Sequence, residues 1–110
     1  MNKIFNLIGL AKKAGKVSNG TIAAKESLNK GKAYLLVMSN DIASNTKEEL
    51  LKYVEKKKTP WIIVGSKYEL GNSVGKEYRV AVTINDFGIA QALIKESECI
   101  GLNVNSVGVV

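Results

Sequence analysis

The chain of 110 residues contains no histidine and only one cysteine, Cys99. The absence of histidine removes the commonest general base and the commonest zinc ligand. A single cysteine forms neither an internal disulfide nor a metal site by itself, which suits a reducing compartment. The longest apolar runs, Tyr34–Met38 and Trp61–Val64, fall far short of the about 20 residues that span a bilayer. We therefore expect a cytoplasmic protein without a metal, a cofactor, a membrane span or a signal peptide.

Side chains that could carry out catalysis are also scarce. The sequence has no phosphate-binding glycine loop that ends in lysine and serine or threonine. The paired acids, Glu48–Glu49 and Glu96–Glu98, have lysines at neighbouring positions, which is typical of solvated ion pairs on helix surfaces. No nucleophile and base are expected to come together, so we predict that the protein is not an enzyme.

The apolar pattern predicts one domain of the α/β class. Hydrophobic residues make up 45% of the chain, which is enough for the core of one compact domain. Helical spacing predicts helices over residues 3–14, 20–30 and 44–58, a short one after Ser66, and a last one after Asn85 or Asp86. Buried strands are predicted at residues 34–38 and 61–64. A further strand with alternating apolar residues is predicted at 78–84, and a minimal strand at 16–18. This alternation predicts a three-layer α/β/α sandwich around a mixed sheet of about four strands.

Several residues are candidates for the ends of these helices and for their buried faces. Gly15 and Gly31 fit left-handed caps where helices end. Candidates at the helix starts are Asn19, Ser44 or Asn45, and Ser66 with Glu69 in a capping box. The last helix is expected to bury Phe87, Ala90, Leu93 and Ile94.

Residues 100–110 are uncharged, apolar and glycine-containing, without helical periodicity. The segment is too hydrophobic for a typical solvated tail. Three roles fit it: docking on the domain, adding an edge strand, or contacting a partner. We therefore predict a domain over residues 1–98 and an apolar tail of unknown role over residues 99–110.

The net charge of +6 is confined to the first third of the chain. Residues 1–38 contain seven lysines and one acid, Glu26, whereas residues 39–110 contain nine basic and nine acidic residues. A one-sided positive field favours a polyanionic partner such as RNA, through phosphate contacts and counterion release. The alternative explanation is ordinary solubility charge on solvated helix faces.

Two loops offer places for a phosphate backbone to approach. The first leads from Lys16 to Gly20, at a helix N-terminus whose free N–H groups can hold a phosphate. The second joins the short helix to the last strand and carries Gly75 and Lys76 at its tip. The strand end at Asn40-Asp41 is expected to lie beside both loops. Each glycine taken alone also fits a plain turn.

Residues in a characteristic order run along most of the chain: Gly20, Gly31 with Lys32-Ala33, Asn40-Asp41, Gly65-Ser66-Lys67, Glu69-Leu70-Gly71 and Gly75-Lys76. In this order they resemble the kink-turn-binding ribosomal protein family, the L-seven-Ae and L-thirty-e group. Leu7–Ala11, Ala14–Lys16 and Ser44–Lys47 are most similar to the bacterial YlxQ-type ribosomal-protein-like members. The resemblance implies the same sandwich, and binding of kinked RNA helices through the helix after Gly20.

The chain departs from the family pattern where bases are read. RNA-binding relatives carry Asn-Glu or Lys-Gln directly after Gly-x, and a lysine further along the helix. This chain has Ile22 and Ala23 instead, and then Glu26 in the lysine position. Lys25, about 100° around the helix, is expected to substitute in part. Contacts to phosphates position a protein on RNA, whereas contacts to base edges determine which sequence it binds. The departure at Ile22, Ala23 and Glu26 therefore predicts kink-turn-like RNA binding that is weaker or differs in specificity.

We predict from these observations a non-catalytic RNA-binding protein associated with ribosomes or translation. Its expected partners are structured RNA, with ribosomal RNA as one candidate, and ribosomal or translation proteins. The alternative is a protein–protein interaction module on the same scaffold that has lost kink-turn specificity. The predicted RNA-binding residues are Lys16, Asn19, Gly20, Thr21, Lys25, Asn40, Asp41, Gly75 and Lys76.

Overall fold

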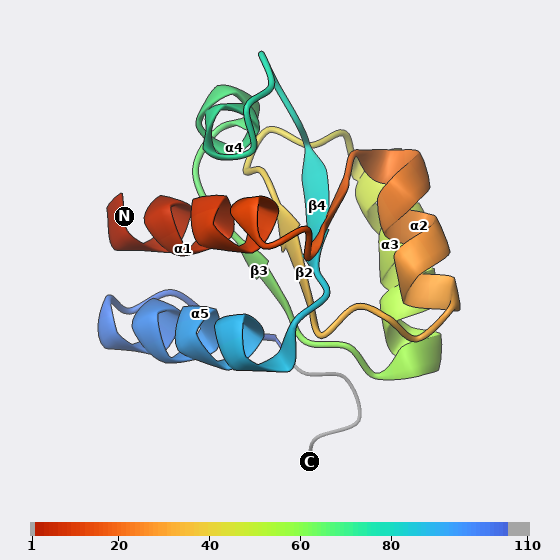
Figure 1. The fold of residues 1–110 in the computed structure, drawn as a ribbon. Coiled ribbons are helices and arrows are strands. Elements are labelled where there is room, and N and C mark those ends of the chain that lie inside the picture. The colour runs from red at the N-terminus through yellow and green to blue at the C-terminus, as the bar shows by residue number, and fades with distance from the viewer. Residues whose placement is uncertain (1, 106–110) are drawn as a thin grey trace.

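A computed structural model of the protein describes residues 2–105 and shows helices on both sides of one mixed sheet (Figure 1). The strands are β1 (Val17–Asn19), β2 (Leu35–Met38), β3 (Trp61–Ile63) and β4 (Ala81–Ile84). The helices are α1 (Asn2–Lys13), α2 (Thr21–Asn29), α3 (Ser44–Lys57), α4 (Lys67–Ser73) and α5 (Phe87–Cys99). The strand order is β1-β4-β2-β3, with β2 parallel to β3 and β4 antiparallel to both of its neighbours. The predicted three-layer α/β/α sandwich is confirmed.

The strand β2 is buried on both of its faces, as its continuous apolar run predicts. Successive side chains of a strand point to opposite sides. Leu35 and Val37 join the core under α1, α4 and α5, while Leu36 and Met38 join the core under α2 and α3. Each helix layer therefore covers a separate hydrophobic core, and the sheet lies between the two cores (Figure 1).

Three of the predicted strands, β2, β3 and β4, are shorter than expected, and β3 is also less buried. Trp61 and Ile63 are half-buried because β3 lies at an edge of the sheet. The segment before β4 leaves the ladder, because the Arg79 amide donates instead to the Lys67 carbonyl at 2.9 Å. At the start of β2, Tyr34 remains 45% exposed.

The predicted helix ends are correct in part. Gly15 and Gly31 have the left-handed conformation, and Ser66 forms the capping box with Glu69. The predicted cap at Asn19 is wrong: Asn19 ends β1, and the residue before α2 is Gly20, with φ +95° and no side-chain cap. Likewise α3 begins after Ala43 without a side-chain cap, so neither Ser44 nor Asn45 caps it.

The first residues of the predicted tail pack on the domain. Leu102 and Val104 contact the core under α1 and α5. The backbone N–H and C=O of Asn105 both bond to Trp61, at 3.0 and 2.9 Å, which makes an antiparallel bridge at the edge of β3. Residues 100–105 therefore pack on the domain and extend the sheet at the edge formed by β3. Residues 106–110, the rest of that predicted tail, lie outside the described residues.

A polar junction at Asn85 joins β1, α2 and β4. The Asn85 side chain donates to the Ser18 hydroxyl at 2.9 Å and accepts from the hydroxyls of Ser27 at 2.8 Å and Thr83 at 2.9 Å. Its backbone amide donates to the Lys16 carbonyl at 2.7 Å. Asp86, not Asn85, caps α5 by accepting from the Ile89 amide. Asn85 thus holds the end of β4 against the start of β1.

We expect Asn85→Ala to lower the free energy of unfolding by about 1–3 kcal/mol, because it leaves the buried hydroxyls of Ser27 and Thr83 without their acceptor. Urea denaturation followed by circular dichroism measures the change. Asn45→Ala, at an exposed position on α3, is the matched control and should change stability by no more than about 0.5 kcal/mol. Equal effects of the two substitutions would contradict the role of this junction.

Candidate nucleic-acid interface

Most of the predicted binding residues meet at one end of the sheet. Gly20 donates its amide to the Ala81 carbonyl at 3.0 Å, at the start of β4. Asn40 donates to the Gly65 carbonyl at 2.8 Å, which places the end of β2 beside the loop after β3. The loop tip with Gly75 and Lys76 follows α4, which begins just after Gly65. The structure therefore brings Asn19, Gly20, Thr21, Asn40, Asp41, Gly75 and Lys76 to the same end of the molecule.

A groove of about 510 Å³ lies between the start of α2 and the segment that precedes β4. We call it the α2 groove. Its walls include Thr21, Ile22 and Ala23 on one side and Tyr78, Arg79 and Val80 on the other. At the start of α2 the groove wall is largely apolar, with Ile22 83% exposed, and Glu26 further along α2 also lines the groove. The groove thus combines an apolar surface with a nearby cation.

Arg79 lies over Gly20 and is held there by several contacts. Its Nε donates to Asn19 Oδ1 at 3.2 Å, and one terminal nitrogen donates to the Tyr78 carbonyl at 2.8 Å. A Cβ built on Gly20 would lie 3.6 Å from Arg79 Nε. Across residues 2–105 Arg79 forms no ion pair, and Glu26, the one acidic residue that also lines the groove, is paired with Lys30. A guanidinium is weakly hydrated and binds phosphate bidentately, which suits an RNA backbone.

The N-terminus of α2 opens onto the same groove. Gly20 adopts φ +95°, which L side chains rarely adopt, and it provides no side chain to cap the helix. The first amides of the helix therefore keep their hydrogen-bonding capacity, and the positive end of the helix dipole points toward the groove. Arg79 and the α2 N-terminus together make a positive site for an anionic group.

Lys67 supplies a second cation near the strand end. Its backbone amide donates to Asp41 Oδ1 at 3.0 Å. Its Nζ lies 5.3 Å from the ring centroid of Tyr68 and 5.6 Å from that of Tyr78. Both tyrosines are exposed, so two aromatic rings and one ammonium group lie together beside the α2 groove. Cation–π contacts of this kind orient the ammonium group without neutralising it.

The Asp41 carboxylate has a local structural role. Its pKa is lowered below the ordinary value, most by the nearby Ser39 hydroxyl and less by the Lys67 backbone amide, while some loss of hydration opposes the shift. The contact with Lys67 has the firmer geometry, because the buried Ser39 hydroxyl has no well-aligned partner within residues 2–105. Asp41 therefore joins the end of β2 to the start of α4.

Close packing fixes the loop that carries Tyr78 and Arg79. A Cβ on Gly71 would lie 2.5 Å from the Tyr78 Cα, so no larger residue fits there. The Lys76 amide donates to the Gly71 carbonyl at 2.9 Å. Gly75, with φ +72°, makes the turn between them. The segment with Tyr78 and Arg79, which forms the groove wall opposite α2, is thus held against α4.

Two predicted residues are not brought to this site. Lys25 points to α3 and pairs with Glu49 at 2.6 Å, which lowers the pKa of that carboxyl. Lys16 lies at the other end of β1, beside Asn85, roughly 10 Å away along the strand. Glu26, by contrast, lines the α2 groove; it pairs with Lys30 at 2.8 Å, and its pKa is lowered by that hydrogen bond and by the lysine charge.

Sequence reasoning missed Arg79, Lys67 and the two tyrosines beside them. One signal was present, because Arg79 is the only arginine among 16 basic residues. Arginine is favoured over lysine where a planar phosphate contact is needed. The position of Arg79 over Gly20 was not visible in the sequence, because the two residues are 59 positions apart.

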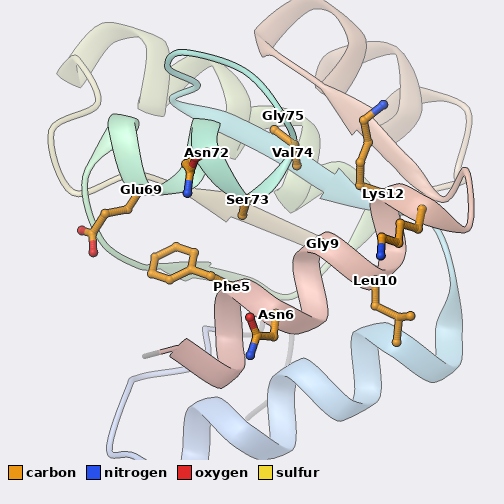
Figure 2. Close-up of a pocket in the computed structure, with 11 residues that line it drawn as sticks. Phe5, Asn6, Gly9, Leu10, Lys12, Glu69, Asn72, Ser73, Val74 and Gly75 are labelled. Carbon is orange, nitrogen blue, oxygen red and sulfur yellow. The ribbon is translucent and has the colours of Figure 1, made fainter.

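A larger hollow, of about 760 Å³, lies between α1 and α4. Figure 2 shows Phe5 on α1 and Asn72 on α4 facing each other across it. Two polar groups of its lining already have internal partners: Glu69 caps the start of α4, and the Ser73 hydroxyl donates to the Leu70 carbonyl at 2.6 Å. No cluster of metal-ligating side chains occurs in the described part of the chain, and no helix there is long and apolar enough to cross a membrane.

Residues 2–94 match the sequence model of the "Ribosomal protein L7Ae/L30e/S12e/Gadd45 family". The chain is 37% identical over 90 residues to "RNA-binding protein YlxQ" of Bacillus subtilis (strain 168), which covers 82% of this chain and 90% of the relative. It is 31% identical over 97 residues to "Large ribosomal subunit protein eL8" of Thermoplasma volcanium, covering 84% and 78% of the two chains. A solved structure of a protein with unknown function from Bacillus halodurans C superposes with a TM-score of 0.82 at 28% identity, covering 86% of this chain and 96% of that one.

We expect Asp41→Asn to flatten the pH dependence of stability. The lowered pKa of Asp41 means that its charge stabilises the folded state above the ordinary pKa, and that this stabilisation is lost as the pH falls through the lowered pKa. Wild type should therefore be the more stable protein at neutral pH, and the two proteins should converge in acid. Urea denaturation between about pH 7 and pH 2 tests this, and parallel curves for the two proteins would contradict it.

Proposed function

The chain belongs to the ribosomal protein L7Ae/L30e/S12e/Gadd45 family, and on this basis we propose that it is a non-catalytic RNA-binding protein of the translation machinery. One relative is named as an RNA-binding protein and another as a protein of the large ribosomal subunit. The proposal includes a cytoplasmic location, where ribosomes work, and structured RNA, such as ribosomal RNA, as the ligand.

The observation that carries the proposal is the α2 groove itself. An uncapped helix N-terminus and the single arginine of the chain face one groove from opposite sides. Lys67, at the start of α4, and Lys76, in the loop after α4, add cations nearby. RNA phosphates are recognised by such cations and by helix N-termini, so these groups support binding of a folded RNA backbone.

Base readout in this groove is expected to be weak. Ile22 and Ala23 have no donors or acceptors at the place where they line the groove. They offer apolar contact with the faces or sugars of nucleotides, whereas specificity among bases comes from hydrogen bonds to base edges. We therefore propose kink-turn-like binding that depends on RNA shape and backbone and discriminates little between base sequences.

A second candidate function follows from Ile22. An isoleucine that is 83% exposed in an apolar groove is a common feature of protein interaction surfaces. In that case the chain is a protein–protein interaction module on the same scaffold. Ile22→Ala separates the two functions, because it removes the apolar contact without adding a charge: it should weaken recovery of an RNase-insensitive protein partner while leaving phosphate-driven RNA binding largely intact.

We expect Arg79→Ala to weaken binding to a kink-turn RNA about ten-fold or more, because a charge-assisted contact to phosphate contributes about 1.5–3 kcal/mol. The slope of log K against log salt should fall by about one unit. Titrations at two salt concentrations measure both effects.

The matched control is Lys95→Ala, which removes the same charge from the exposed side of α5, away from the groove. It should change the affinity far less than Arg79→Ala. RNA binding that is insensitive to salt, or equal losses in the two variants, would rule out the α2 groove as the RNA site.

A further inference from the structure

Two exposed aromatic side chains meet at the end of the sheet opposite to the α2 groove. Tyr34 and Phe87 are 45% and 59% exposed. Their ring centroids lie 5.6 Å apart at an interplanar angle of 77°, an edge-to-face pair. Phe87 was predicted to be buried, and the structure shows that prediction to be wrong. An apolar ring pair of this kind at the surface contributes nothing to the core and is available to a ligand.

Lysines border this pair because two helices end beside it. In α1 the amides of Gly15 and Lys16 bond back to Lys12 and Ala11, and α2 ends in the same way. In α2 the glycine is Gly31 and the following residue is Lys32. Both ends are Schellman motifs. In each motif the residue after the glycine is a lysine, Lys16 or Lys32.

Lys16, Lys32 and Tyr34 line one hollow of about 520 Å³, together with Asn85. Asn85 precedes the start of α5, where Phe87 is the first helical residue. The hydrogen bonds of Asn85 to Lys16 and β1 therefore hold the lysine side and the aromatic side of this hollow together. We call the surface formed by Lys16, Lys32, Tyr34 and Phe87 the lysine–aromatic surface.

The positive charge beside Tyr34 and Phe87 exceeds what ion pairs and helix dipoles neutralise. Within the described part of the chain, Lys16 and Lys32, which line this hollow, form no ion pairs, while Lys30 is paired with Glu26. Each helix C-terminus is equivalent to roughly −0.5 charge, so two such ends offset about one lysine. The Asp86 carboxylate caps α5, where the positive end of the helix dipole compensates part of its charge. A net positive surface remains around the exposed rings.

We propose that the lysine–aromatic surface binds a single-stranded RNA segment, with an unpaired base stacked on the Tyr34–Phe87 pair and its flanking phosphates held by Lys16 and Lys32. Single-strand sites combine aromatic platforms with cationic grooves in this way, because every base has a face that stacks. Helix-dipole compensation accounts for lysines at helix ends, but not for two aromatic rings left exposed between them.

The inference rests on the proposed function, because it assigns a second contact surface for the same class of ligand. The helix α2 connects the two surfaces: its N-terminus opens onto the α2 groove and its C-terminus leads to Lys32. With nine residues it is about 14 Å long. A folded RNA in the groove and its unpaired extension therefore have room to contact the two surfaces at once.

The test uses the full chain and two probes: a kink-turn RNA without overhangs and an oligouridine of about eight nucleotides, within the range of single-strand sites. Phe87→Leu, which keeps an apolar side chain but removes the ring, should weaken oligouridine binding at least about five-fold. Lys16→Ala with Lys32→Ala should weaken it as well and reduce its salt dependence. Phe87→Tyr, which keeps the ring, should retain the affinity.

Affinity for the kink-turn RNA should be unchanged in these variants, whereas Arg79→Ala should affect that RNA and spare oligouridine. If Phe87→Leu leaves the affinity for oligouridine unchanged while kink-turn binding still depends on Arg79, this inference fails and the proposed function stands. If oligouridine binding depends on Phe87 but no folded RNA binds, the proposed function fails instead. Loss of an RNase-insensitive protein partner in Phe87→Leu, with oligouridine binding intact, would assign the surface to protein and overturn the inference.

Discussion

The pairing of β4 between β1 and β2 determines where every surface residue lies. Val82 faces Asn19 on one side and Val37 on the other, and Ile84 faces Val17 and Leu35. Because β4 is buried on both faces, a slip of one residue would move each side chain into the opposite core, so the register is strongly specified. The same register brings Gly20 beside the segment that enters β4, and Lys16 beside the segment that leaves it. Antiparallel pairing thus creates two separate ends with different chemistry.

The two ends differ in how they present positive charge. Beside the α2 groove, the cations are held by directional contacts: Arg79 by the Asn19 side chain, and Lys67 between two tyrosine rings. At the other end Lys16 and Lys32 follow helix-terminating glycines, and their side chains have no ion-pair partner among residues 2–105. Positioned cations suit a ligand of fixed shape, and flexible ones suit a ligand that adapts.

Much of the fold follows from the sequence, since its signals are local. The continuous burial of Leu35–Met38 and the capping box at Ser66 each depend on adjacent residues, and the structure confirms both. The family resemblance is also confirmed, because it draws on residues spread along the whole chain. Local patterns were weaker at element ends: Gly20, rather than the expected Asn19, precedes α2, since the Asn19 side chain is already engaged by Arg79.

The site was harder to predict, because it depends on contacts between distant residues. Lys25 fits the polar face of its own helix, but Glu49 on α3 takes up its charge. Phe87 fits the apolar stripe of α5, yet it occupies the first turn, where the helix has not reached the sheet. Arg79 approaches Gly20 only because the Lys67 carbonyl draws its backbone away from the ladder. Helical periodicity carries no information on any of these three contacts.

The bridge between Asn105 and Trp61 has a consequence for how the protein behaves in a crowded solution. An edge strand with free N–H and C=O groups is a template on which another chain can add a strand. Asn105 occupies both groups of Trp61, and Lys47 lies 5.5 Å from the centroid of the Trp61 ring. With β3 only three residues long, little of that edge is left for a foreign strand. The segment after α5 thus covers the β3 edge of the sheet, where a strand of another chain could otherwise pair.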